Sequence, residues 1–347
     1  MPFRLALLAP FAHPSVRGNA VTVARVARGL EARGVALRVW DLSVAPEHAV
    51  EAEVDAWRPA LIHAFHAYRV GPLALRLARR AELPLVVTLT GTDANHDLFD
   101  PARAPVVRRV LDGAARVTAF HASTAARVAA ALPDLAGRLV VVPQAARLEG
   151  REGFDFAGRF PLPPGALLVV FPAGIRVVKR PLLPLRPLTR LAARLPALRL
   201  LFAGPILDPD LGETLLRELA DRPWARHVGA VAHAQMASLY ARADIVLNCS
   251  LSEGGMANSV LEALALGRAV LAADIEGNRS LVEDGVTGLL FRDEAELEAQ
   301  AERLAAEAAL RRRLGAAGRA LVAARFPEAR EIDGYLEVYR VLAPVGA

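Results

Sequence analysis

Two glutamates enclose a glycine-containing segment, EGGMANSVLE, at residues 253–262. An apolar run ends just before this segment and helical spacing resumes within it, which predicts a strand, a loop and a helix. Main-chain N–H groups of such a loop and helix N-terminus suit a diphosphate, and the residues that supply them are Gly254, Gly255, Met256, Ala257, Asn258 and Ser259. Glu253 and Glu262 instead accept hydrogen bonds from hydroxyl groups, so a ligand with both phosphates and sugars is expected. An ordinary strand-to-helix turn with surface glutamates is the alternative.

Lys179 is the only lysine of the chain, although lysine and arginine together number 42. It lies in FPAGIRVVKRP (residues 171–181), with Arg176 before it, directly after an apolar run that predicts a strand. A lysine ammonium is a compact charge on a flexible stem, whereas arginine presents a planar fork. A tight loop that places one charge between two phosphates can require the compact group. Composition alone does not explain the one ammonium group: it either meets a steric requirement of this loop or is a lysine left by chance on a surface loop.

Further polar residues follow predicted strands in the first half of the chain. Thr92 and Asp93, in VVTLTGTDANHD, carry groups that either hold sugar or acceptor hydroxyls or cap the next turn. His63 and His66 end another apolar run, where a partly buried structural histidine is the expected outcome.

Apolar runs alternate with amphipathic stretches along the whole chain, which predicts βαβ units and parallel sheets. The runs in the first half are FRLALLAP, VALRVW, PALIHAFH, LPLVVTLT, ARVTAFH and RLVVVPQ. Those in the second half are ALLVVFPAG, ALRLLFAG, ARHVGAV, ADIVLNCS, RAVLAAD and TGLLF. A segment rich in glycine, proline and charge, residues 147–165, is the expected linker. We predict an α/β protein with two doubly wound Rossmann-like domains, 1–150 and 151–325, and a C-terminal helix within 326–347 that packs on the first domain.

Composition excludes several classes of protein. Hydrophobic residues make up 54% of the chain and charged residues 23%, a balance that disfavours disorder. The net charge of +5 comes from arginines scattered among acidic neighbours, without a basic stripe interleaved with aromatics, so no nucleic-acid partner is expected. No stretch approaches the roughly 18 uninterrupted apolar residues of a membrane span, and the N-terminal run, broken by Pro10, is expected to be a buried strand rather than a signal peptide. With a single cysteine, Cys249, these features predict a cytoplasmic protein with at most peripheral membrane contact.

The segment at residues 248–291 resembles the donor-binding motif of retaining, family-4-type glycosyltransferases of the GT-B fold. In that motif a glutamate and a glycine precede a second glutamate, and a later run ends in GxTGLL; this chain has EGGMANSVLE and then GRAVLAADIEGNRSLVEDGVTGLLF. In the family the first glutamate faces the donor sugar and the second holds the ribose hydroxyls, so the resemblance assigns these roles to Glu253 and Glu262. Eight residues separate the two here, where the family has seven, and the loop near Met256 is expected to absorb the extra residue.

The resemblance extends to other segments. An arginine and a lysine that grip the donor diphosphate correspond to Arg176 and Lys179, with a shorter spacing than in the family. HVGAVAHAQMASLYARADIVLNCS resembles the run whose backbone, from Gly229 to Val231, cradles the base. VRGNAVTVARVARGL resembles the loop and helix that face acceptor and sugar, which implicates Gly18 and Asn19.

One further departure, one excluded class and two subgroups qualify the resemblance. Thr90 stands where many members have a histidine that contacts the donor sugar. VRGNAVTVARVARGL lacks the GxGxxG fingerprint of a dehydrogenase, which counts against that class. LTGTD, EGGMAN and LDPDLGE resemble selenosugar synthases, whereas GNAVT and GIRVVKRP resemble proteins called glycosyltransferase 1 domain-containing.

The resemblance implies a retaining glycosyltransferase that transfers a sugar from a nucleotide-diphospho-sugar, expected to be UDP-linked, to an unidentified acceptor. No cofactor and no metal are expected, because the cations of the site neutralise the phosphates. The pair Asp208 and Asp210 lies beside a proline, where a turn is the expected role. Selenosugar-synthase-like transfer to selenophosphate, a sugar-nucleotide epimerase or hydrolase, and a non-catalytic nucleotide-sugar binder are the alternatives. The sequence does not determine the oligomeric state.

Overall fold

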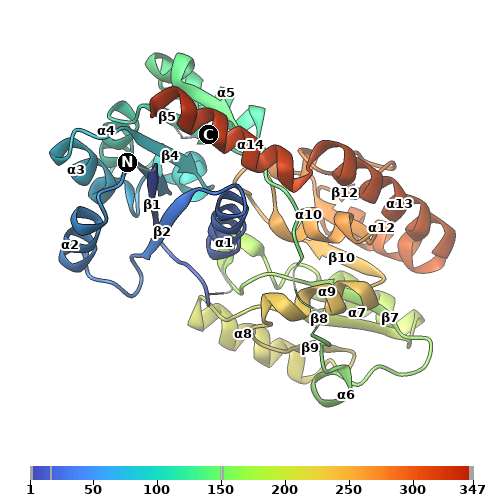
Figure 1. Cartoon of the computed structure of the whole chain (residues 1–347). Coiled ribbons are helices and arrows are strands. Elements are labelled where there is room, and N and C mark those ends of the chain that lie inside the picture. The colour runs from blue at the N-terminus through green and yellow to red at the C-terminus, as the bar shows by residue number, and fades with distance from the viewer. Residues whose placement is uncertain (1–2, 16–17, 149, 151, 344–347) are drawn as a thin grey trace. The chain divides into compact units, whose positions relative to one another are not determined.

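The computed structural model of the chain describes residues 3–15, 18–148, 150 and 152–343 (Figure 1). Some residues of the predicted segments lie outside these ranges. They are 16 and 17 of the predicted acceptor-facing segment, 149 and 151 of the predicted linker, and the last four of the C-terminal segment. The chain divides into two compact units, one formed by Met1–Ala145 with Phe326–Ala347 and the other by Ala146–Arg325.

The first unit contains a six-stranded parallel sheet in the order β2-β1-β3-β4-β5-β6. Its strands are β1 (Arg4–Ala9), β2 (Ala36–Asp41), β3 (Leu61–Phe65), β4 (Leu85–Leu89), β5 (Arg116–Ala119) and β6 (Leu139–Val141). Its helices are α1 (Gly18–Glu31), α2 (Glu47–Trp57), α3 (Gly71–Arg80), α4 (Ala104–Asp112), α5 (Ala122–Ala131) and α14 (Glu328–Leu342), with a π-helical turn at Asp93–Asp97 and a 3₁₀ turn at Pro133–Arg138.

Helices cover both faces of this sheet because successive strand residues point to opposite sides. On β1, Leu5 and Leu7 pack in one apolar cluster with residues of α1 and α14, whereas Ala6 and Leu8 pack in another with residues of α2 and α3. All four side chains are fully buried, as expected for a parallel strand with both faces covered.

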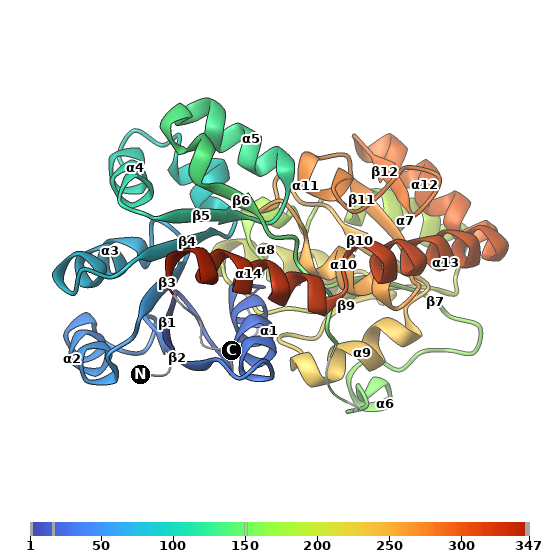
Figure 2. The same cartoon turned by 45° about the horizontal axis from the view of Figure 1, so that its top comes forward.

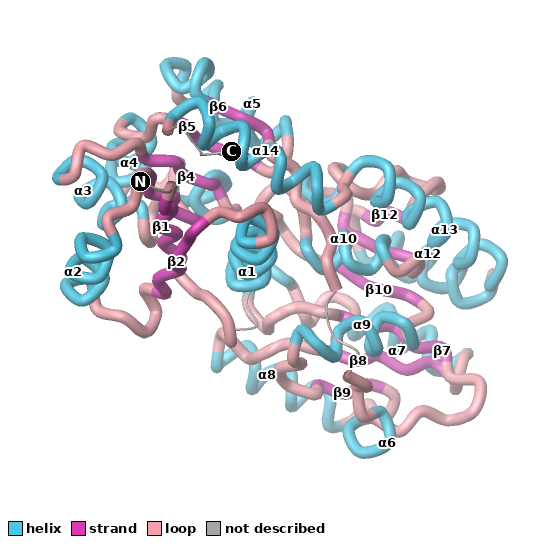
Figure 3. Tube along the Cα trace, viewed as in Figure 1, coloured by secondary structure: helices cyan, strands magenta, loops and turns pink. Residues whose placement is uncertain are grey.

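The second unit repeats the architecture with the strand order β12-β11-β10-β7-β8-β9, and every pairing is parallel. Figure 3 distinguishes its strands from its helices by colour. Its strands are β7 (Leu167–Phe171), β8 (Leu198–Phe202), β9 (Ala225–His227), β10 (Ile245–Asn248), β11 (Ala269–Ala273) and β12 (Leu289–Phe291). Its helices are α6 (Phe156–Arg159), α7 (Leu185–Arg194), α8 (Pro209–Ala220), α9 (His233–Arg242), α10 (Asn258–Ala265), α11 (Glu276–Arg279), α12 (Glu294–Ala306) and α13 (Ala308–Arg325), with a 3₁₀ turn at Val177–Lys179. The prediction of two doubly wound parallel α/β sheets is confirmed.

The strand order of the second unit places a topological switch point between β7 and β10. From β7 the chain proceeds outward to β8 and β9, then returns to the other side of β7 and proceeds through β10, β11 and β12. The connections after β7 and β10 therefore diverge, and the crevice outside their carboxyl ends is where open α/β sheets bind ligands. This position holds both segments that the sequence singled out, after β7 and after β10.

Helix α14 completes the first unit, where it lies beside α1 (Figure 2). Arg25 of α1 forms a bidentate ion pair with Glu331 of α14, at 2.7 and 2.8 Å, and both side chains are almost fully buried. Glu331 Oε2 also accepts a hydrogen bond from the Ala145 amide at 3.2 Å. One buried carboxylate thus joins α1, α14 and the last residue of the first segment of this unit.

Candidate active site

The loops after β7 and β10 are joined by three contacts at the switch point. Lys179 Nζ forms an ion pair with Glu253 Oε1. The Leu251 amide donates to the Val178 carbonyl at 2.8 Å, and Arg180 Nε donates to the Cys249 carbonyl at 2.7 Å. The structure therefore brings together Lys179 and Glu253, which are far apart in the sequence.

Glu253 is held in a fixed polar setting. Its Oε1 accepts hydrogen bonds from Asn248 Nδ2 at 3.1 Å and from Ser250 Oγ at 2.6 Å, in addition to the Lys179 ammonium. Burial favours the neutral acid, but the charge of Lys179 and these hydrogen bonds outweigh burial and hold the pKa of Glu253 below its usual value. Glu253 is therefore a carboxylate at neutral pH, and its side chain is 11% exposed.

The turn after Glu253 leads directly into α10. Gly255 has φ 107°, a conformation that residues with a Cβ rarely adopt. The side chains of Met256 and Ala257 are buried, so they are not available to a ligand. Ala257 precedes the first residue of α10, Asn258, and contributes no side-chain cap. The predicted helix start is confirmed.

Glu262, on α10, lies against α9 and is 7% exposed. Its Oε1 contacts His233 Nε2 at 3.1 Å, and its Oε2 accepts a hydrogen bond from the Tyr240 hydroxyl at 3.1 Å. Burial and the neighbouring Glu262 raise the pKa of Tyr240, so the phenol remains protonated and donates. Both partners lie in HVGAVAHAQMASLYARADIVLNCS, which the sequence singled out for its backbone, but their contacts with Glu262 were not predicted.

The remaining predicted donor-side residues lie at the ends of neighbouring strands. Arg176 is exposed and precedes the 3₁₀ turn that contains Lys179. Val231 is buried after β9, near Gly229, which has φ 70° and accepts a hydrogen bond from the Gly204 amide at 2.8 Å. The loops after β7, β9 and β10 thus supply the predicted residues from one edge of the sheet.

In the first unit, the predicted residues Asn19 and Thr92 each form a side-chain hydrogen bond. Gly18 and Asn19 are the first residues of α1, and Asn19 Nδ2 donates to Thr90 Oγ1 at 3.3 Å. Thr92 Oγ1 lies 2.9 Å from His66 Nε2. Thr90, where many family members have a histidine, is therefore a partner of Asn19.

Asp93 is bound to main-chain amides of its own turn and of a neighbouring loop. It is fully buried, and its carboxylate accepts hydrogen bonds from the amides of Ala67, Thr90, Gly91 and Ala94 at 2.8 to 3.1 Å. Of the two roles that the sequence left open, turn capping is the one that these contacts display.

The two histidines are also internal. His63 is fully buried, with Nδ1 2.7 Å from the Tyr339 hydroxyl and Nε2 2.7 Å from Thr88 Oγ1. Burial lowers the pKa of His63 to about 3, so the imidazole is neutral in the folded protein. His66 is also buried, and desolvation lowers its pKa although Asp93 and Asp97 act in the opposite direction. The expected structural role of both histidines is confirmed.

The Asp-x-Asp segment does not form a metal site. Asp208 caps α8 by accepting a hydrogen bond from the Leu211 amide at 3.1 Å, so its predicted turn role is confirmed. Within the described ranges no cluster of three or more His, Cys, Asp or Glu side chains is arranged to hold a metal.

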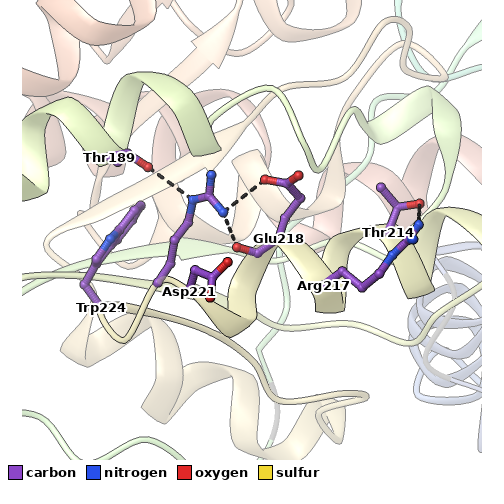
Figure 4. Close-up of a pocket in the computed structure, with 7 residues that line it drawn as sticks. Thr189, Thr214, Arg217, Glu218, Asp221 and Trp224 are labelled. Carbon is purple, nitrogen blue, oxygen red and sulfur yellow. Dashed lines mark hydrogen bonds and ion pairs between the residues drawn. The ribbon is translucent and has the colours of Figure 1, made fainter.

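A depression of about 600 Å³ opens beside the C-terminal half of α8 (Figure 4). Its polar side chains bond to one another: Arg222 contacts Thr189 Oγ1 at 3.2 Å and Glu218 Oε2 at 3.0 Å. Trp224, which also lines it, immediately precedes β9. The depression therefore lies toward the amino ends of the strands, at the other edge of the sheet from Lys179 and Glu253.

Comparisons with known proteins identify the family of the chain. The family model described as glycosyl transferases group 1 matches residues 167–307. D-inositol 3-phosphate glycosyltransferase of Segniliparus rotundus is 30% identical over 318 residues, which cover 84% of this chain and 68% of that protein. The chain belongs to the group 1 glycosyltransferases. Glycosyltransferase 1 domain-containing protein 1 of Xenopus tropicalis is 27% identical to this group 1 glycosyltransferase over 305 residues, 86% of each chain.

Solved structures share the fold of this glycosyltransferase at lower identity. HepE of Anabaena, solved in complex with UDP and glucose, aligns with a TM-score of 0.76 and 17% identity over 98% of this chain and 100% of that one. Sucrose-phosphate synthase of Thermosynechococcus elongatus aligns with a TM-score of 0.80 and 20% identity over 98% and 99% of the chains. These likenesses confirm the GT-B fold class. Among the described residues, no helix is both long enough and apolar enough to span a bilayer.

Proposed function

We propose that this glycosyltransferase retains the anomeric configuration and transfers a sugar from a UDP-sugar to an acceptor without a metal ion. The observation that carries the proposal is the Lys179–Glu253 pair at the switch point of the second sheet, beside the turn that leads into α10. The UDP complex of HepE supports the choice of nucleotide by analogy of fold.

Lys179, Arg176 and the amides of residues 254–259 stabilise the departing diphosphate in this proposal. A lysine ammonium has three donors, so Lys179 can keep its bond to Glu253 while it donates to phosphate oxygens. Charge that develops on the leaving group is met by fixed donors in a partly buried site, where such donors are most effective. These positive groups perform the neutralisation that a divalent cation performs in other transferases.

The reaction is a front-face displacement. The bond between the anomeric carbon and the diphosphate oxygen breaks while the acceptor oxygen bonds to the same face of that carbon. The acceptor proton passes to the departing phosphate oxygen, so atoms and charges balance. Glu253, ionised and positioned by Asn248 and Ser250, accepts hydrogen bonds from hydroxyls of the donor sugar.

In this proposal the nucleoside of the donor binds beside the diphosphate, at Glu262 and the backbone near Val231. Glu262 accepts the ribose hydroxyls, since each carboxylate oxygen has lone pairs beyond those used by His233 and Tyr240. The backbone near Val231 contacts the base. Gly18, Asn19 and Thr92 contact the acceptor, and the buried Asp93 carboxylate fixes the turn that contains Thr92. The segment 326–347 is part of the acceptor-side domain.

Two kinds of acceptor are suggested by the relatives and by the family resemblance. D-inositol 3-phosphate glycosyltransferases among the relatives act on a phosphorylated polyol, and a selenosugar-synthase-like reaction would use selenophosphate. Both would place an anion beside the donor. A cytoplasmic location accords with the single cysteine, which is buried.

The proposal is tested in two steps. A thermal-shift screen against UDP-, GDP- and ADP-sugars identifies the donor, and UDP-sugars are expected to raise the melting temperature most. Proton NMR of the product then gives the anomeric configuration, with EDTA present in a parallel reaction. A retained anomer and EDTA-insensitive turnover are expected. An inverted product, an isomerised free nucleotide sugar, rapid donor hydrolysis, or binding without any transfer would each overturn it.

A further inference from the structure

We propose that Asn278 and Asn248 are positioning residues that orient Glu253 through a buried relay of two side-chain amides. The inference rests on the proposed function, because it gives the relay its effect on the reaction. Neither asparagine is required to touch substrate, and neither was among the site residues predicted from the sequence.

The relay begins at α11 and ends at Glu253. Asn278 is fully buried, and its Nδ2 donates to the Ala273 carbonyl at 2.9 Å and to Asn248 Oδ1 at 3.2 Å. Asn248, the last residue of β10, is 5% exposed, and its Nδ2 donates to Glu253 Oε1 at 3.1 Å. The relay thus connects the ends of β10 and β11 to the carboxylate that faces Lys179.

The hydrogen bonds determine which way the Asn248 amide points. Asn248 Oδ1 accepts from two donors, Asn278 Nδ2 and the Ser250 amide, the latter at 3.0 Å. An amide rotated by half a turn would present Nδ2 to both donors and its oxygen to the Glu253 carboxylate. Both consequences are unfavourable, so Asn248 is held with its donor toward Glu253.

Helix α11 supports Glu253 from a second side. A Cβ added at Gly277 would lie 2.5 Å from Glu253 Cβ, so the helix backbone contacts the glutamate side chain directly. Ser280 Oγ donates to the Gly255 carbonyl at 2.5 Å. Asn278 lies in the sequence between Gly277 and Ser280, the residue that follows α11, so α11 and its C-terminal end contact both Glu253 and the turn that follows it.

The effect of the relay is on turnover rather than on donor affinity. The diphosphate contacts are made by Lys179, Arg176 and main-chain amides, none of which is a member of the relay. A hydrogen bond to a charged group contributes about 1.5 to 3 kcal/mol, which corresponds to a ten- to hundredfold change in rate if it is used fully at the transition state.

Steady-state kinetics of the full chain with a UDP-sugar tests the relay through two variants. Asn248→Asp keeps the shape of the side chain and an oxygen for Asn278 and Ser250, but turns a carboxylate oxygen toward Glu253. Asn278→Ala removes the donor that orients Asn248. We expect kcat to fall ten- to hundredfold in Asn248→Asp and about tenfold in Asn278→Ala, while the UDP dissociation constant changes less than threefold. Gln144→Ala, which removes a buried amide in the first unit, is the matched control and should retain kcat.

A double-mutant cycle separates positioning from general structural support. If Asn278 acts through Glu253, Asn278→Ala should change kcat less than twofold in a Glu253→Gln background. A folded Asn278→Ala or Asn248→Asp protein with unchanged kcat, or an undiminished effect in the Glu253→Gln background, would overturn the relay. Wild-type protein that turns over no UDP-sugar would instead overturn the proposed function. Asn248→Asp, which changes no volume, keeps the test valid if Asn278→Ala does not fold.

Discussion

Replacing Lys179 by alanine removes the one ammonium group at the switch point of the second sheet. In the folded protein this group pairs with Glu253, and the side chains are 14% and 11% exposed. After the substitution Glu253 retains Asn248 and Ser250 as donors but loses its counter-charge. The substitution therefore affects both stability and the proposed reaction.

The size of each effect follows from this setting. Exposed ion pairs contribute about 0 to 1 kcal/mol, whereas breaking a fully buried pair costs about 3 to 5 kcal/mol. The Lys179–Glu253 pair is intermediate in burial and Glu253 keeps two hydrogen bonds, so we expect a loss of about 2 kcal/mol in the free energy of unfolding. Removing one fixed donor to developing charge lowers kcat by about 10² to 10³.

Urea unfolding and steady-state kinetics measure the two effects separately. Lys179→Arg keeps the charge but replaces a compact ammonium with a planar fork, so it should recover stability and only part of kcat. Arg186→Ala, which breaks an exposed pair with Glu294, controls for the loss of a cation elsewhere in the same unit. A Lys179→Ala protein that folds and turns over at the wild-type rate would refute the reasoning.

Three further predictions concern buried groups. Glu331→Gln should lower the free energy of unfolding by about 3 to 5 kcal/mol in urea titrations because it leaves Arg25 buried without a counter-charge, and an unchanged midpoint would contradict this. The pKa of His63 is about 3 in the folded protein, so the unfolded state binds a proton more readily. The contribution of His63 to the free energy of unfolding is therefore complete above pH 6.5 and is lost as the pH falls toward 3, by up to about 1.4 kcal/mol per pH unit. His63→Asn should reduce that slope in urea titrations at several pH values, and an identical slope would exclude His63 as its source. Glu262→Gln should raise the UDP dissociation constant about tenfold in calorimetry, as expected for weakening a charged hydrogen bond; wild-type affinity would show that Glu262 does not hold the ribose.

Local pattern was sufficient to predict the strands. Each of the apolar runs read from the sequence overlaps an observed strand, and the inner strands, buried on both faces, are nearly continuous apolar runs. The start of α10 after a glycine-containing turn was predictable for the same reason, since turn chemistry and helical spacing are local properties.

The contacts of the site were not predictable from local pattern. Lys179 meets Glu253 only because β10 pairs with β7, and this depends on the order of strands in the sheet. Arg180 adopts a left-handed conformation with φ 47° and bonds to the Cys249 carbonyl, which its sequence neighbours do not signal. Asn248 could have been noticed as a polar residue that ends an apolar strand, where side chains of parallel sheets reach ligands.

The most direct test of the central claim uses the fact that the chain has one lysine. Protein labelled with ¹⁵N-lysine gives a single side-chain ammonium resonance, and UDP can be titrated against it. The account predicts that this resonance shifts with the same dissociation constant that calorimetry gives for UDP, and that Glu262→Gln moves both constants together. UDP that binds while the Lys179 resonance stays unmoved would contradict the claim that this ammonium contacts the diphosphate.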